Sequence, residues 1–321
     1  MNLSEFEKGQ PVGHESAWRG VELFNSSFWE RQVPKNHFSA IDSLDCRQWF
    51  LEIQDELENG CGAVLLKGAE VSGVSSLELK NRFLKFCSQI GTPLSQSAKG
   101  ENVFSVRDEG YGSSDPRTRG PNTRKKLSFH TDRCDVIGFL CLKPAKRGGE
   151  NQVVSSVALY NAILQQRPEL LEVLCEPYYY QRHNVDVGND QQYIQQPIFS
   201  FFRGCFASNF LRVLIDRASI SGEVPPMTSR QKEALDYLEN LAGDPEFHVT
   251  FRQEEGDILL LNNWVTYHRR TEFEDEQAVE RRRHLLRVWL AVPNSRPLHP
   301  LFKGNYGATE GGAIRGGINA S

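Results

Sequence analysis

Residues 256–270, GDILLLNNWVTYHRR, carry the pattern that decides the fold of this chain. A glycine-aspartate turn signal precedes four apolar residues at 258–261, which predict a short buried strand. A longer apolar run at 284–292, HLLRVWLAV, predicts another strand shortly downstream. His268 lies between the two, so the stretch places a candidate metal ligand between two core strands.

Further strands are predicted on both sides of the largely helical section at 157–250. Short apolar runs predict strands at 63–66, 136–142 and 152–154. Capping residues and helical apolar spacing predict helices at 45–58, 76–90, 156–166, 168–174 and 229–242. This order departs from the strict β-α alternation of a doubly wound sheet. It favours a mostly β protein with flanking helices, built on a jelly-roll barrel.

The chain is expected to form a single domain over 1–321. No repeat, low-complexity block or obvious linker divides it, and β-rich barrels often exceed roughly 200 residues as one unit. Residues 1–43 are expected to be an N-terminal extension, and 157–250 a largely helical insertion between core strands. The glycine-rich tail over 297–321 is expected to form a surface loop that could act as a lid.

The composition argues against several classes of partner. A net charge of −4 and 24% charged residues give no overall footprint for nucleic acid or an anionic membrane. No apolar run approaches the roughly 20 residues needed to span a bilayer, and the polar N-terminal stretch lacks the apolar segment of a signal peptide. Seven dispersed cysteines without a C-x-x-C pair indicate reduced thiols, several of them buried. We therefore expect a cytoplasmic protein.

Of the eight histidines, His130 alone is followed two positions later by an acidic residue, Asp132. In an extended segment, residues i and i+2 point to the same face, so both side chains could reach one metal ion. The pair by itself is weak evidence, because a chain of this composition would contain such a pair by chance. Two histidines and one carboxylate form the facial triad of non-haem iron(II) oxygenases, and His268 is the best candidate for the third ligand.

Two arginines beyond His268 make the pattern more specific. Arg283 lies 15 residues after His268, and a 2-oxoglutarate site needs a buried cation that can bind a carboxylate bidentately. Arg283, Leu285 and Arg287 alternate onto one face of the last long strand, so two guanidinium groups can enter the same cavity.

Four segments resemble the motifs of the taurine dioxygenase family, also called TauD/TfdA: FHTD at 129–132, GGENQVVSS at 148–156, NNWVTYHRR at 262–270 and RRRHLLRVWL at 281–290. Their order and spacing extend the resemblance over roughly residues 60–292. The resemblance implies a double-stranded β-helix, a cupin-like jelly roll, that binds iron(II). It also implies that O2 is split with 2-oxoglutarate as co-substrate, releasing succinate and CO2, and that the chain could form a homo-oligomer.

The resemblance also implies roles for particular residues. His130, Asp132 and His268 would be the iron ligands, and Arg283 would bind the distal carboxylate of 2-oxoglutarate. Arg287 matches a position that in several members meets an anionic group of the substrate. An aspartate ligand speaks against a halogenase, in which a small residue would leave a site for chloride.

The chain departs from the family at one position. Where many members carry a threonine or serine that hydrogen-bonds 2-oxoglutarate, this chain has Asn151, with Gln152 as the alternative. An amide can still donate that bond. The remaining histidines considered, His183, His248 and His284, are expected to be structural.

The substrate is expected to be a small molecule that is anionic or amino-acid-like, oxidised by hydroxylation or a related C–H oxidation. Arg287 and Arg133, the latter beside the ligand Asp132, favour an anionic group. Phe104 and Arg107 come just upstream of the histidine pair and are expected to line the substrate pocket.

Two other functions stay open on the sequence alone. A zinc-dependent hydrolase or lyase could use the same His/Asp/His site, since catalytic zinc also takes three protein ligands and keeps an open position. Arg283 argues against it, because a zinc hydrolase has no need for that arginine. A non-catalytic jelly-roll binding module would retain no iron and would not lose function when Asp132 is changed.

Overall fold

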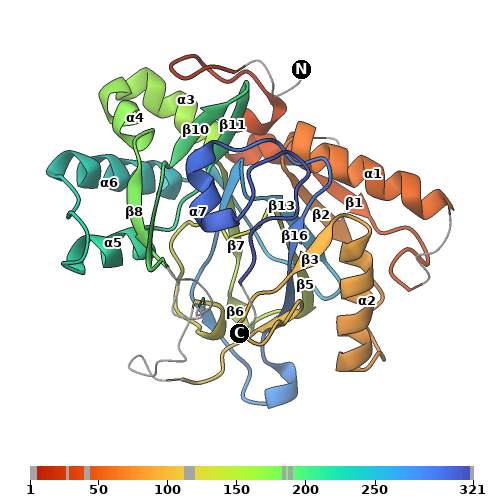
Figure 1. Ribbon diagram of the computed structural model, residues 1–321. Helices are drawn as coiled ribbons and strands as arrows, with labels where there is room; N and C mark the ends of the chain where they lie inside the picture. Colours follow the sequence, from red (N-terminus) through yellow and green to blue (C-terminus); the bar gives the residue numbers. More distant parts are fainter. Residues whose placement is uncertain are drawn as a thin grey trace.

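The computed structural model describes residues 6–26, 29–39, 44–111, 120–182, 186 and 191–318. Seven of the described strands form one large sheet in the order β1-β2-β13-β5-β16-β3, with β4 also paired to β16 (Figure 1). All of these pairs are antiparallel except β1 with β2. The strands are β1 (Glu30–Gln32), β2 (Ala63–Lys67), β13 (Ile258–Asn262), β5 (Val136–Lys143), β16 (His284–Ala291), β3 (Thr92–Leu94) and β4 (Phe104–Val106).

A smaller sheet packs against the large one. It consists of β12 (His248–Phe251), β7 (Asn151–Ser155) and β14 (Thr266–Arg270). Val153 and Val249 of the small sheet share one buried apolar cluster with Leu259 and Trp289 of the large sheet. Two largely antiparallel sheets packed face to face confirm the predicted jelly-roll core.

Two helices, α1 (Leu44–Asn59) and α2 (Ser76–Ser88), cover the outer face of the large sheet (Figure 1). Phe50 of α1 and Phe83 of α2 belong to the same buried cluster as Leu260 and Leu286. Successive strand residues alternate between the two faces, so Leu260 meets the helices whereas Leu259 turns toward the small sheet.

Residues 157–250 hold more β structure than the sequence predicted. The helices α3 (Ser156–Gln166), α4 (Pro168–Leu174), α5 (Arg212–Ile220) and α6 (Ser229–Gly243) lie on the opposite side of the molecule from α1 and α2 (Figure 1). Between them, β8 (Tyr178–Gln181) pairs with β9 (Tyr193–Gln196), and β10 (Phe199–Phe202) pairs with β11 (Cys205–Ser208). The expectation of a largely helical insertion missed these two strand pairs, whose aromatic runs favour extended backbone.

The C-terminal tail is packed into the protein, so the prediction of a surface loop is wrong. Helix α7 (Lys303–Tyr306) contributes Tyr306 to an apolar cluster around Trp264. The Arg315 side chain is fully buried, and its Nε lies 2.7 Å from Asp135 Oδ1. Gly316 has a φ of +85° and lies so close to the backbone of Arg133 that a Cβ atom would not fit. Glycine here marks a close backbone approach.

Most of the predicted elements are confirmed. The predicted helices correspond to α1, α2, α3, α4 and α6, and the predicted strands to β2, β5, β7, β13 and β16, with ends that shift by at most two residues. All seven cysteines lie in the described part of the chain, where none of them forms a disulfide, and five of them are buried. None of the described helices is both long enough and apolar enough to cross a membrane.

Candidate active site

Two histidines are brought together by strand pairing. His268 lies in the middle of β14, and His130 pairs with it in an isolated antiparallel bridge. The backbone N–H of each residue donates to the carbonyl of the other, at 3.1 and 3.0 Å. Residues directly opposite each other on neighbouring strands point to the same face. The two imidazole rings therefore lie side by side, with 4.4 Å between their centroids.

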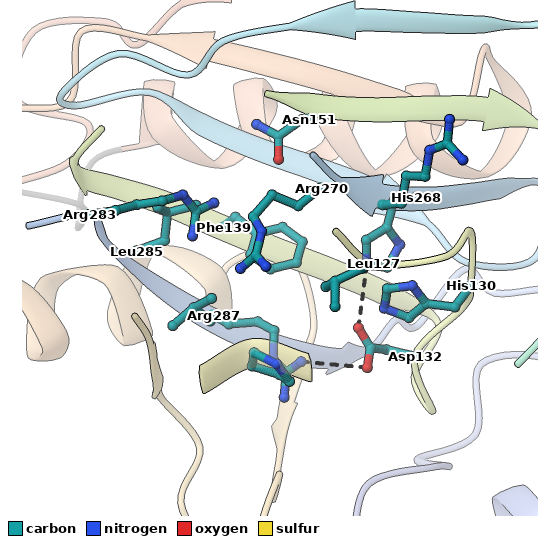
Figure 2. Close-up of a pocket in the computed structure, with 13 residues that line it drawn as sticks. Leu127, His130, Asp132, Phe139, Asn151, His268, Arg270, Arg283, Leu285 and Arg287 are labelled. Carbon is teal, nitrogen blue, oxygen red and sulfur yellow. Dashed lines mark ion pairs between the residues drawn. The ribbon is translucent and has the colours of Figure 1, made fainter. Parts of the chain in front are cut away.

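The loop that carries Asp132 is fixed from two sides. Its neighbour Thr131 donates its N–H to the carbonyl of Phe210 at 2.8 Å and accepts from Asn209 Nδ2 at 3.0 Å. The N–H of Asp132 donates to Asn263 Oδ1 at 3.1 Å. With its backbone held in this way, Asp132 points its carboxylate toward the two imidazoles (Figure 2).

The three side chains form a site that fits a metal ion. Ligand atoms of His130, Asp132 and His268 all lie within 4.8 Å of one another. Oδ2 of Asp132 is buried without a hydrogen-bond partner among the described residues, 3.5 Å from Nε2 of His268. Nδ1 of His130 lies 2.9 Å from the carbonyl oxygen of Ser128, which leaves its Nε2 for a metal. A divalent transition metal would satisfy this buried oxygen and both rings.

Electrostatics hold two of these groups in the form that binds metal. Burial raises the pKa of the Asp132 carboxyl, but the Arg287 guanidinium and both imidazoles outweigh burial and hold this pKa below its ordinary value. Burial, and then the neighbouring His268, lowers the pKa of His130 from 6.5 to about 4. At neutral pH the carboxylate is therefore ionised and the His130 ring is neutral, as metal ligands must be.

A pocket extends from the three candidate ligands into the space between the two sheets. It encloses about 450 Å³, part of which is open to solvent. Much of its wall is apolar and comes from Val106, Pro121, Leu127, Phe139 and Leu285. Figure 2 shows the candidate ligands on one side of the pocket and Arg283 on the other. An apolar wall with a few placed charges is typical of a small-molecule site.

Arg283 is 3% exposed and lies just before β16, on the far side of the pocket. Its backbone N–H donates to Asp275 Oδ1 at 2.8 Å, and its guanidinium lies 5.1 Å from the ring centre of Phe273. Nη1 is buried without a hydrogen-bond partner in the described part of the chain. Burial lowers the pKa of Arg283 to about 10, so the side chain is still charged at neutral pH. A buried charge of this kind requires an anionic partner.

Arg287 connects the candidate metal site to the pocket. Its Nη1 lies 3.5 Å from Asp132 Oδ1, and its Nε donates to Gln96 Oε1 at 2.7 Å. The rings of Phe104 and Trp289 lie 5.3 and 4.9 Å from the guanidinium. Nη2 has no hydrogen-bond partner among the described residues, so one end of the side chain can still bind an anionic group.

The choice between Asn151 and Gln152 is decided by strand alternation. Asn151 lines the pocket, and its Nδ2 donates to Gln253 Oε1 at 3.0 Å. Gln152 lies on the other face of β7, where it accepts from Arg269 Nε at 2.6 Å and donates to Thr250. Of the two candidates, only Asn151 can meet a molecule in the pocket.

Three other predicted pocket residues lie elsewhere. Arg107 is about half exposed and forms an ion pair with Glu109 at 2.8 Å, because its neighbour Val106 takes the position that faces the pocket. Arg133 turns away from Asp132, and its Nη1 lies 2.6 Å from Asp186 Oδ2. Phe104 covers the Arg287 guanidinium and does not line the pocket itself.

Arg270 is the main pocket residue that the sequence reasoning missed. It lies two positions after His268 on β14, and both residues line the pocket. The i, i+2 rule that connected His130 with Asp132 would have found it. Of the histidines expected to be structural, His248 bonds the carbonyl of Ala242 at 3.0 Å and His284 lies outside the pocket. His183 is outside the described residues.

A jelly-roll core that brings two histidines, a carboxylate and a buried arginine to one pocket defines the class of non-haem iron oxygenases. The chain belongs to the taurine catabolism dioxygenase TauD, TfdA family, whose model matches residues 30–289. The resemblance seen in the sequence is therefore confirmed. The protein is therefore a dioxygenase that uses iron(II) and 2-oxoglutarate.

Individual relatives agree with this assignment. FR-33289 synthase of Streptomyces rubellomurinus is 34% identical over 248 residues, which cover 75% of this chain and 72% of that protein. A uridine-5'-phosphate dioxygenase of an Amycolatopsis species is 26% identical over 190 residues, 56% of this chain and 66% of that protein. The solved structure of an asparagine oxygenase has a TM-score of 0.63 at 14% identity, covering 82% of this chain and 93% of that one, and supports the fold.

Proposed function

We propose that His130, Asp132 and His268 hold iron(II), and that Arg283 binds the distal carboxylate of 2-oxoglutarate. One observation carries this proposal. Asp132 Oδ2 and Arg283 Nη1 are both buried without hydrogen-bond partners among the described residues, and they belong to opposite sides of one pocket. A metal cation would satisfy Asp132 Oδ2, and a carboxylate would satisfy Arg283 Nη1. A 2-oxo acid that chelates the metal would connect the two sides of the pocket.

When bound, iron(II) with 2-oxoglutarate supplies the activation of O2 that oxidises a C–H bond of the substrate. The residues of the chain bind, orient and exclude water. The Ser128 carbonyl fixes the ring of His130 through Nδ1, and Arg287 holds Oδ1 of Asp132 so that Oδ2 faces the ion. Leu127 and Phe139 form the apolar wall that keeps water from the reacting atoms.

The proposed substrate is a small molecule with an anionic group, which Arg287 would bind through Nη2. The limited volume of the pocket, about 450 Å³ including its open part, supports a small molecule. One relative at 26% identity is named for uridine-5'-phosphate, a substrate with an anionic phosphate. A carboxylate would bind the same guanidinium end, and the reaction would be a hydroxylation or a related C–H oxidation.

We further propose that residues 1–321 work as one oxygenase domain that forms a homo-oligomer in the cytoplasm. The packing of the tail against Asp135, close to Asp132 in sequence, supports a single unit. Seven cysteines that form no disulfide in the described part of the chain support a reducing compartment. Size-exclusion chromatography with light scattering would test the oligomer.

The proposal is tested by titrating the purified protein with iron(II) and then 2-oxoglutarate in the absence of oxygen. A weak visible charge-transfer band should appear when the 2-oxo acid chelates the bound metal. The variant Asp132→Ala should lose iron binding, and Arg283→Gln should keep iron but weaken 2-oxoglutarate binding.

Two matched variants serve as controls. Glu109→Gln removes an acidic group outside the pocket, and Arg282→Gln removes the exposed arginine next to Arg283. Neither should change the titration. Iron binding without any band on addition of 2-oxoglutarate would contradict the proposed roles of the pocket residues.

A further inference from the structure

We propose that Arg270 is a second co-substrate-binding residue, which together with Arg283 binds the distal carboxylate of 2-oxoglutarate. This inference rests on the proposed function and assigns a role to a residue outside the metal site, in addition to Arg283 and Arg287. Three observations carry it: the position of the guanidinium, the missing counter-charge, and the orientation of Asn151.

The first observation is position. Arg270 ends β14, is 5% exposed and lines the same pocket as Arg283. Both guanidinium groups lie over the ring of Phe273, at 4.6 Å for Arg270 and 5.1 Å for Arg283. In the view of Figure 2, the side chain of Arg270 reaches into the pocket between Arg283 and the two histidines. Both cations therefore border the same part of the pocket, where a carboxylate would meet them together.

The second observation is charge. Among the described residues, neither Arg270 nor Arg283 has a carboxylate oxygen within salt-bridge distance. An arginine side chain stays protonated in proteins, so the pocket holds two buried positive charges. Two buried like charges in one pocket destabilise the protein unless an anion lies between them.

The donors of Arg270 are only partly used. Its Nε donates to the carbonyl of Thr271 at 3.2 Å, and its Nη2 donates to the carbonyl of Lys125. These two bonds fix the plane of the guanidinium and leave Nη1 for a ligand. A guanidinium fixed in this way loses little conformational entropy when it binds a carboxylate.

The third observation concerns Asn151, at the position where many family members carry a hydroxyl donor. Gln253 donates from Nε2 to the carbonyls of Phe139 and Asp257, both at 3.2 Å, so its Oε1 must face Asn151. Nδ2 of Asn151 donates to that oxygen at 3.0 Å, and Figure 2 shows Oδ1 turned toward the pocket. A carbonyl oxygen cannot donate to a carboxylate. Arg270 supplies the donor that Asn151 does not.

The test compares two 2-oxo acids on the iron(II)-loaded full chain without oxygen. 2-Oxoglutarate has the distal carboxylate, and 2-oxopentanoate lacks it but chelates iron in the same way. Arg270→Gln should weaken 2-oxoglutarate binding by roughly 10- to 100-fold, as expected for loss of a hydrogen bond to a charged group. The affinity for 2-oxopentanoate should stay the same. Both affinities are measured from the charge-transfer band and by calorimetry.

Arg269→Gln is the matched control. Arg269 is the preceding residue on β14 and also borders the pocket, but its guanidinium is turned away from Arg283: it lies 4.1 Å from the ring centre of Phe129 and donates to Gln152. This variant should bind 2-oxoglutarate like the unchanged protein. If Arg270→Gln does not fold, Arg270→Lys keeps the charge and should show a smaller but still selective loss for 2-oxoglutarate.

The outcomes separate the alternatives. If Arg270→Gln weakens both 2-oxo acids equally, Arg270 acts only by anchoring the chain at Lys125, and the inference is overturned. Unchanged 2-oxoglutarate affinity in that variant overturns it as well, while a selective loss in Arg283→Gln would leave the proposed function intact. If the unchanged protein itself does not prefer 2-oxoglutarate to 2-oxopentanoate, the proposed function fails first.

Discussion

The two faces of strand β16 carry opposite kinds of side chain. On the outer face, Leu286, Val288 and Leu290 are fully buried against α1 and α2. On the inner face, Arg287 is also buried, with 3% of its surface exposed, and Arg283 lies on the same side directly before the strand. The outer face is stable without any ligand, because its apolar side chains are buried against other apolar side chains. The buried charges of the inner face destabilise the fold until ions or ligands of opposite charge compensate them.

The largest effect on folding is expected from the outer face. Leu286→Ala would leave a cavity between β16 and the helices and should lower the free energy of unfolding by about 2–5 kcal/mol. Iron and 2-oxoglutarate affinities should be unchanged in the folded fraction. Urea denaturation with parallel ligand titration measures both. A loss of ligand affinity comparable to the loss of stability would show that the two faces are not independent.

The inner face should respond in the opposite way. Arg287→Leu removes a buried charge and the partner of Asp132 Oδ1, so kcat/KM should fall on the order of 100-fold. The free energy of unfolding of the iron-loaded protein should change little, since the metal still compensates the charge of Asp132, whereas the iron-free protein should be destabilised by the unpaired carboxylate. Steady-state kinetics and urea denaturation of the same preparation test this. A loss of stability as large as that of Leu286→Ala would contradict it.

A smaller effect is expected at Gly149, which lies beside Arg283. Gly149 has a φ of +73°, and a Cβ atom there would lie 3.2 Å from Arg283 Nε. Gly149→Ala should therefore displace the guanidinium and weaken 2-oxoglutarate binding by about 10-fold, with a stability loss of about 1 kcal/mol from the backbone alone. Gly243→Ala, at a glycine with open space around it, is the control. Equal 2-oxoglutarate affinities in both variants would rule out this role for Gly149.

The smallest effect concerns His284, at the start of the outer face. Burial, and then the charges of Arg107 and Lys80, lowers its pKa from 6.5 to about 4. The unfolded state therefore binds more protons between these values, and stability falls as the pH drops through that window. His284→Gln should reduce the loss of stability between pH 6.5 and 4. Denaturant midpoints measured across this range check it, and an unchanged pH profile would contradict it.

The sequence predicted the parts of the molecule that depend on local periodicity. Apolar runs located the core strands, and alternation correctly predicted that Arg283, directly before β16, and Arg287, within it, face the same pocket. Arg107 and Arg133 face away from the pocket, although their nearness in sequence to the candidate ligands predicted them to be in it. Alternation beyond His268 indicates Arg270, which the structure places in the pocket.

Contacts between distant parts of the chain could not be predicted in this way. Asp135 and Arg315 are 180 positions apart, and nothing in the glycine-rich tail indicates a buried cation. The antiparallel bridge between His130 and His268 is equally non-local. The sequence connected these two residues only as candidate ligands of one metal ion, and their strand pairing came from the structure. Local patterns identify faces of strands, whereas the pairing of strands decides which faces meet.

The buried tail connects two distant parts of the chain at the candidate metal site. Arg315 donates to Asp135 at 2.7 Å, and the N–H of Gly317 donates to the carbonyl of Arg133, next to Asp132, at 2.8 Å. The loop that presents the Asp132 carboxylate is therefore held by a segment about 180 positions later in the chain. A substitution in this segment, far from the pocket, would change the position of the carboxylate without touching any residue of the pocket.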